Sequence, residues 1–143
     1  HGATYKATQV QADKRKNTFT ANIATAYPAE AEVESWIRSY SLQKGQLRIS
    51  YSFRLTTAKQ PNQINFMTWG QVNTEIPGKI QLEVKGKKAF IEYDKQLFDV
   101  KTETIPLTDP RLSNVWGKSI YRITLTATNI YKTGNYSFII KKQ

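Results

Sequence analysis

The sequence predicts an all-β fold, an antiparallel β-sandwich of roughly eight to ten strands. Apolar and polar side chains alternate along most of the chain, which is the pattern of strands with one buried face. Turn signals rich in Gly, Pro and Asn separate these short runs. Between them lies no helical stretch of about 10–15 residues, such as parallel strands need for their crossover connections. Short strands joined by short turns therefore favour a sandwich over a parallel sheet.

The first half of the chain predicts strands around Phe19–Ile23, around Trp36 and over residues 47–55. The last is the clearest, because five apolar side chains at every second position alternate with Arg and Ser and would share one face. Over Pro28–Val33 we expect a bend or a single turn, since six residues are too few to nucleate a stable helix. The Lys44-Gly45 pair predicts a turn before the long strand.

The second half predicts further short strands, at residues 64–66, at 80–84, from Ala89, at 123–125 and at 136–140. Gly86 predicts a tight hairpin between the second and third of these strands, and Gly134-Asn135 predicts another hairpin before the last one. Asp109-Pro110 predicts a turn. No repeat, linker or low-complexity segment divides the chain, so we expect one domain spanning residues 1–143.

The charge balance favours acidic partners. The chain has 21 Lys and Arg against 11 Asp and Glu, a formal net charge of +10. Such a field attracts acidic polysaccharide, nucleic acid and anionic lipid alike. Nucleic acid is not predicted as a partner, because no binding motif accompanies the charge, and a membrane is not predicted because no apolar run approaches about 20 residues. The densest basic groups are expected on solvated turns and termini: Lys14–Lys16, Lys85 with Lys87-Lys88, and Lys141-Lys142.

Catalytic and cofactor chemistry finds little support in the sequence. The chain has no Cys, and its single His is His1, which predicts neither a hydrolase triad nor a metal site. No glycine-rich phosphate loop is present, so no cofactor is expected. Glu30, Glu32 and Glu34 alternate and are interpreted as a solvated surface row rather than a glycosidase pair. We therefore predict no catalytic residue in this chain.

The three Trp residues are the candidates for stacking on sugar rings. Trp36 is expected as a core anchor within a strand, and Trp116, before Gly117, as a turn plug. Trp69 ends a strand and is better placed for a ligand, because loops carry function more often than cores do. The sequence also contains a formal glycosylation motif, Asn135-Tyr136-Ser137, which we discount because it begins a predicted buried strand.

A collinear series of markers covers nearly the whole chain: Tyr27-Pro28, Trp36-Ile37-Arg38, Phe53-Arg54-Leu55, Thr68-Trp69-Gly70, Glu103–Arg111, Trp116-Gly117 and Tyr121-Arg122-Ile123. In this order the series resembles the C-terminal β-domain of heparinase II/III-like polysaccharide lyases. The resemblance implies a non-catalytic β-sandwich that supports a catalytic module and contributes to substrate binding. The implied substrate of the whole protein is an acidic polysaccharide, glycosaminoglycan or alginate-like.

In that family, as the resemblance implies, an N-terminal helical toroid and the start of the β-region carry the catalytic His and Tyr. No residue of this chain inherits a catalytic role. A start at His1-Gly2 without Met fits a C-terminal fragment, whose expected partner is the missing N-terminal catalytic module in a periplasmic or secreted protein. The residues expected to contact acidic glycan or a domain interface are Trp69, Arg38, Arg111 and Arg122. The alternative is a free-standing carbohydrate-binding module for an acidic glycan.

Overall fold

The computed structural model describes residues 4–143 and confirms an all-β, antiparallel β-sandwich fold class. The described residues form eleven strands, one more than the upper prediction, together with one α-helix and two short 3-10 helices, η1 and η2. These elements are β1 (Thr8–Asp13), β2 (Thr18–Asn22), η1 (Ala24–Ala26), η2 (Ala29–Ala31), β3 (Val33–Gln43), β4 (Gln46–Leu55), β5 (Gln63–Thr68), β6 (Gln71–Ile76), β7 (Lys79–Val84), β8 (Lys87–Glu92), β9 (Phe98–Pro106), α1 (Pro110–Trp116), β10 (Ser119–Ala127) and β11 (Thr133–Lys142).

The chain divides into two compact units. Unit 1 comprises the residues up to Gln60 together with Ile130–Lys141, and unit 2 comprises Pro61–Asn129 together with Lys142–Gln143. Unit 1 is therefore built from both ends of the chain, whereas nearly all of unit 2 is one continuous segment. The single domain expected over residues 1–143 stays a prediction.

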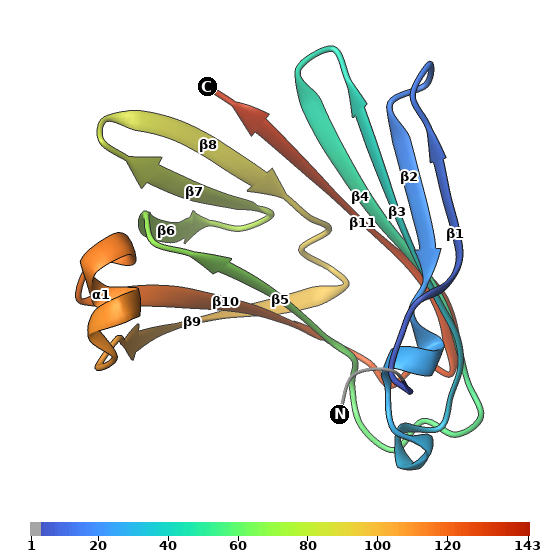
Figure 1. The fold of residues 1–143 in the computed structure, drawn as a ribbon. Coiled ribbons are helices and arrows are strands. Elements are labelled where there is room, and N and C mark those ends of the chain that lie inside the picture. Colours follow the sequence, from blue (N-terminus) through green and yellow to red (C-terminus); the bar gives the residue numbers. More distant parts are fainter. Residues whose placement is uncertain (1–3) are drawn as a thin grey trace. The chain divides into compact units, whose positions relative to one another are not determined.

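Unit 1 is an antiparallel sheet in the order β1-β2-β3-β4-β11 (Figure 1). Its core is an aromatic cluster in which the rings of Trp36 and Phe53 stack at 5.1 Å and those of Phe53 and Tyr136 lie 4.9 Å apart. Phe138 meets the Tyr51 ring edge-on at 5.9 Å and is fully buried. The alternation over residues 47–55 is thus confirmed as a strand with one buried face, and Trp36 is buried in the core.

Unit 2 contains two antiparallel groups of strands, β8-β7-β6 and β5-β10-β9. Its most deeply buried side chains come from both groups, with Ile80 and Ile91 in the first and Ile123 and Leu125 in the second. The hairpin predicted at Gly86 is confirmed, because Lys85-Gly86 joins β7 to β8 and both residues have positive φ, as a tight hairpin turn requires. The turn expected over Pro28–Val33 contains the short helix η2.

The hairpin predicted at Gly134-Asn135 is wrong. Both residues lie inside β11, where they pair with Phe53 and Ser52 of β4. A Cβ atom at Gly134 would lie only 3.0 Å from the Phe53 ring, so this glycine allows close packing within a strand and does not form a turn. Three strands, β1, β6 and β9, the short helix η1 and the helix α1 were not predicted.

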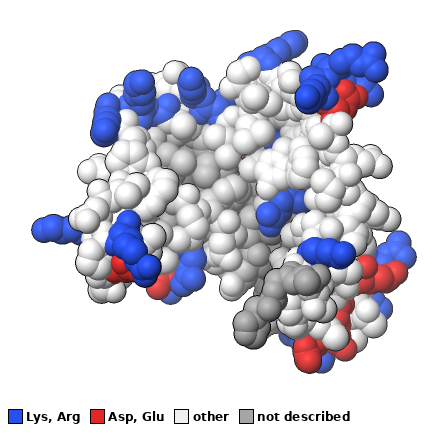
Figure 2. Space-filling view, viewed as in Figure 1, with Lys and Arg blue, Asp and Glu red and all other residues white. Residues whose placement is uncertain are grey.

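Basic side chains occupy the turns, as expected. Lys14–Lys16 lie in the exposed turn between β1 and β2, and Lys85, Lys87 and Lys88 are exposed at the turn between β7 and β8. Figure 2 shows the excess of Lys and Arg over Asp and Glu on one face. No helix in the described part of the chain is long and apolar enough to cross a membrane.

Candidate functional site

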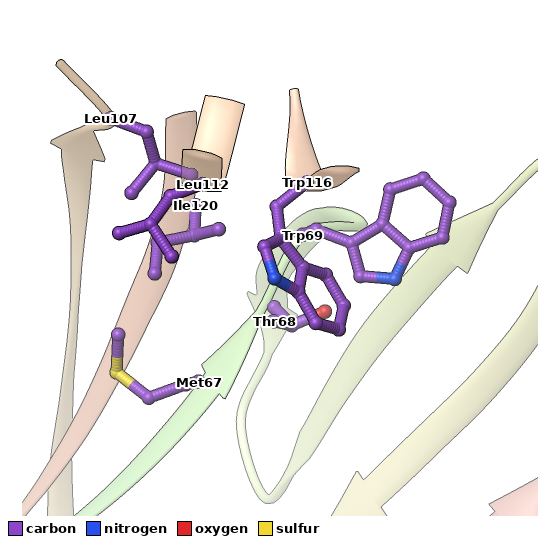
Figure 3. A pocket seen from close by; sticks show the side chains of 7 residues that line it. All are labelled: Met67, Thr68, Trp69, Leu107, Leu112, Trp116 and Ile120. Carbon is purple, nitrogen blue, oxygen red and sulfur yellow. The ribbon is translucent and has the colours of Figure 1, made fainter. Parts of the chain in front are cut away.

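An open groove of about 290 Å³ lies at one end of the β5-β10-β9 sheet in unit 2 (Figure 3). It combines the end of β5, the β5–β6 turn, the chain after β9, one side of α1 and the start of β10. Its lining is almost wholly apolar and consists of Met67, Thr68, Trp69, Leu107, Leu112, Trp116 and Ile120. Such a lining suits a flat apolar ligand face.

Helix α1 forms one wall of the groove, and its capping explains why this short segment is helical. The side chain of Asp109 accepts a hydrogen bond from the backbone N–H of Arg111 at 2.9 Å, and Pro110 occupies the first helical position. Gly117 ends the helix with a φ of 88°. Leu112 and Trp116 are four residues apart and therefore lie on the same side of the helix, toward the groove.

Trp69 is held by the tight turn between β5 and β6. The Thr68 hydroxyl accepts a hydrogen bond from the Gly70 N–H at 3.1 Å, and Gly70 lies directly against the backbone of Glu83 and the side chain of Val84. This close approach fixes the turn on the end of β7. Trp69 is 43% exposed and Trp116 is 48% exposed. Figure 3 shows both indoles among the side chains that line the groove.

Two of the predicted arginine contacts already have carboxylate partners. Arg111 forms a bidentate pair with Asp109, with its Nη2 at 2.7 Å from Oδ2 and its Nε at 3.2 Å. Arg122 on β10 pairs with Glu103 on β9 at 2.5 Å. Both arginines belong to unit 2 and adjoin groove residues, since Arg111 precedes Leu112 and Arg122 lies opposite Met67 in the sheet. Each arginine is therefore engaged in an ion pair at the surface.

Arg38 belongs to unit 1 and lies in another environment. Its guanidinium carbon is 5.2 Å from the centre of the Tyr51 ring, a cation–π distance. Within residues 4–143, its buried Nε and the Nε1 of Trp36 have no hydrogen-bond partner. Burial raises the pKa of the Tyr51 hydroxyl above its ordinary value.

Sequence reasoning named Trp69 as a ligand contact but none of the other six lining residues, among them Trp116. It also did not single out Lys85, which lies beside the groove. Trp116 was expected as a turn plug, but it ends an amphipathic helix turn and is half exposed. The Nζ of Lys85 lies 5.9 Å from the centre of the Trp69 ring. Signals for both existed in the sequence, namely the Asp109-Pro110 cap with Gly117 after Trp116, and the hairpin turn that carries Lys85.

A polar strip continues from the groove along the outer face of the β5-β10-β9 sheet. Ile120 lines the groove, and the next residues on the same face of β10 are Arg122, Thr124 and Thr126. The Thr124 hydroxyl and the side-chain oxygen of Asn65 on β5 are hydrogen-bonded at 2.7 Å. Side chains on this face are spaced about 7 Å apart along each strand. The strip therefore offers hydrogen-bonding groups at regular intervals to a bound linear polymer. The exposed members are Gln63, Asn65, Lys101, Glu103 and Arg122.

The acidic row in unit 1 is engaged in ion pairs. Glu32 accepts a hydrogen bond from the Thr57 hydroxyl and lies 3.3 Å from the Nζ of Lys59, which together lower its pKa, the hydroxyl contact contributing most. Glu34 lies 3.8 Å from Arg54. These pairs agree with a surface row. His1 lies outside the described residues, and residues 4–143 contain no cluster of three or more His, Cys, Asp or Glu suited to a metal ion.

No protein-family model matches this chain, and no characterised protein matches its sequence. Function is therefore inferred from the groove and from the motifs in the sequence.

Acid is expected to loosen the helical wall of the groove. The Arg111 side chain, and then its backbone N–H, lower the pKa of Asp109 below its ordinary value near 3.8. A lowered folded-state pKa stabilises the helix above the ordinary value, and this contribution is lost as the pH falls through the folded-state pKa. We expect the amide signal of Arg111 to shift only below about pH 4, as measured by NMR. The Asp109→Asn variant, which keeps a capping side chain without a titratable group, should show no such transition.

Proposed function

We propose that this chain is a non-catalytic accessory β-sandwich of a heparinase II/III-like polysaccharide lyase, and that it holds acidic polysaccharide for a catalytic module elsewhere in the protein. The substrate class is a glycosaminoglycan or alginate-like polymer. A protein acting on such polymers would work in the periplasm or outside the cell.

The observation that carries the proposal is the pair of half-exposed indoles at one groove, contributed by Trp69 and Trp116. Exposed aromatic rings present a flat apolar face that matches the C–H face of a sugar ring. The polar strip beside the groove supplies hydrogen-bonding groups in the direction of the strands, and the net charge of +10 favours an acidic polymer. The series of motifs from Tyr27-Pro28 to Tyr121-Arg122-Ile123 supports the lyase family.

The groove lining suits holding a sugar more than transforming it. Of its seven residues, none is ionisable, and its one hydroxyl, on Thr68, already accepts the Gly70 N–H. A lyase must remove a proton beside a uronic carboxylate, which needs a base and a charge-neutralising group. We therefore assign the chemistry to the catalytic module and the retention of the polymer to this groove.

Replacing either groove tryptophan is expected to weaken glycan binding. Trp69→Ala and Trp116→Ala should each raise the Kd for heparin or alginate about threefold to tenfold, because an aromatic contact of this kind contributes about 0.5–1.5 kcal/mol. The measurement is calorimetric titration at about 0.15 M salt, where weak surface electrostatics are largely screened.

Val115→Ala is the matched control for the helix, because Val115 is 70% exposed on α1 and does not line the groove. Its affinity should equal that of the unaltered protein. If the two tryptophan variants bound glycan as tightly as the unaltered protein, the proposal would be contradicted. The alternative, a free-standing carbohydrate-binding module, uses the same groove. It requires that adding the catalytic module leave the affinity unchanged.

A further inference from the structure

Three lysines, Lys85, Lys87 and Lys88, crowd the turn between β7 and β8 next to the groove. We propose that this lysine turn is an anion subsite, which receives a carboxylate or sulfate group of the same polymer whose sugar ring lies on Trp69. The inference rests on the proposed function and adds to it the element that selects acidic over neutral glycan.

Strand register places the lysine turn beside Trp69. Gln71 of β6 lies opposite Glu83 of β7. Because the two strands are antiparallel, the β5–β6 turn, which precedes Gln71, lies against Val84 and the β7–β8 turn. Gly70 confirms this approach, since a Cβ atom there would lie 2.5 Å from Val84 Cγ2. The Nζ of Lys85 consequently lies 5.9 Å from the centre of the Trp69 ring.

The ammonium groups of the lysine turn, unlike the neighbouring arginines, are available to an external anion. Among residues 4–143, none of the three lies within salt-bridge distance of a carboxylate, whereas Arg111 and Arg122 are both paired. Glu83 is the acidic residue of the β7–β8 hairpin nearest to them, and it lies opposite Lys88 in the ladder. Lys85 and Lys87 have no acidic residue opposite them.

The end of the chain adds one more cation. The backbone N–H of Gln143 donates to the carbonyl oxygen of Lys88 at 3.2 Å, which brings Lys142 alongside the lysine turn within unit 2. Figure 2 shows blue side chains gathered around the end of unit 2 where β7 turns into β8. Clustered, unpaired positive charge raises the local concentration of an acidic polymer and strengthens its hold.

Position and charge together define the ligand chemistry. An ammonium beside an exposed indole fits a flat ring that bears an anionic substituent at its edge, as in a uronic acid or a sulfated sugar. Single-stranded nucleic acid also combines stacking with negative charge. The polar strip of Asn, Thr and Gln beside the groove favours the hydroxyl-rich polysaccharide.

The test compares two double variants that lose the same charge, one member of each pair lying in a similar turn. Lys85 and Lys44 both have a φ of 49°, both are exposed, and both precede a glycine in a hairpin turn. We expect Lys85→Gln/Lys87→Gln to raise the Kd for heparin about tenfold at about 0.15 M salt and to make binding less sensitive to salt. Lys44→Gln/Lys132→Gln, with both changes in unit 1, should shift it less than twofold. The affinity for laminarin, an uncharged glucan, should be unaltered by either.

The outcomes separate this inference from the proposed function. Unaltered heparin affinity in Lys85→Gln/Lys87→Gln, with affinity lost in Trp69→Ala, overturns the anion subsite and leaves the groove. If heparin affinity is unaltered in both Lys85→Gln/Lys87→Gln and Trp69→Ala, the proposed binding of glycan at the groove is overturned as well. If Lys85→Gln/Lys87→Gln loses heparin affinity and Trp69→Ala does not, the proposal that the lysine turn and Trp69 bind the same polymer is overturned. A homopolymeric single-stranded DNA that binds as tightly as heparin, with the same dependence on the lysines, overturns the assignment to polysaccharide.

Discussion

Gly70→Ala is expected to lower the free energy of unfolding by about 1–3 kcal/mol, the usual cost of forcing extra volume into a packed site. The new Cβ atom would lie 2.5 Å from Val84 Cγ2 and 2.7 Å from the carbonyl oxygen of Glu83. Backbone atoms cannot move aside as a side chain can, so the β5–β6 turn must shift. That shift carries Trp69 with it and should also weaken glycan binding. Denaturant unfolding measures the first effect, and heparin titration the second.

A double-mutant cycle with Val84→Ala tests the assigned cause. Removing the Val84 methyl groups relieves one of the two close contacts, so the double variant should be less destabilised than the sum of the single variants. The Glu83 carbonyl remains, so recovery should be incomplete. Strict additivity would show that the cost of Gly70→Ala arises from something other than this contact.

Phe138→Ala is expected to have the largest effect on stability, lowering the free energy of unfolding by about 3–5 kcal/mol. Phe138 is fully buried and its ring meets that of Tyr51 at 5.9 Å, so truncation leaves a cavity in the aromatic cluster of unit 1. Thermal and denaturant unfolding followed by circular dichroism would measure the loss.

Phe19→Ala is the control for the same chemical change at an exposed site. Phe19 is 42% exposed and its ring lies 6.1 Å from that of Tyr40. Its truncation should cost well under half as much as that of Phe138, since much of its surface already contacts water. Equal losses in the two variants would contradict the assignment of Phe138 to the core.

The strands could be predicted because burial of one face imposes a visible alternation. Residues 47–55 show this pattern most clearly, and the structure places their apolar face in the core of unit 1. Helix α1 was missed because seven residues are too short to show helical periodicity, and its signal is confined to the caps at Asp109 and Gly117. Gly134 was misassigned because a glycine that admits a neighbouring ring and a glycine that forms a turn look alike in a sequence.

The groove was less predictable than the fold. Trp69 could be singled out by its place at the end of a strand, but its neighbours come from distant parts of the chain. Trp116 reaches the groove only because α1 forms, and Lys85 reaches Trp69 only because β6 and β7 pair in one register. The partners of Arg111 and Arg122 likewise depend on a cap and on cross-strand pairing, which a list of residues does not reveal.

The division of unit 1 between the two ends of the chain has a consequence for biosynthesis. A ribosome releases β4 long before β11, and nearly all of unit 2 emerges between them. Until Thr133–Lys142 leaves the exit tunnel, the β4 edge lacks its nine-residue pairing with β11, and Phe138 is missing from the aromatic cluster. Unit 2 can therefore complete its own ladders first, while nascent unit 1 presents an unpaired strand edge of the kind that chaperones protect from aggregation.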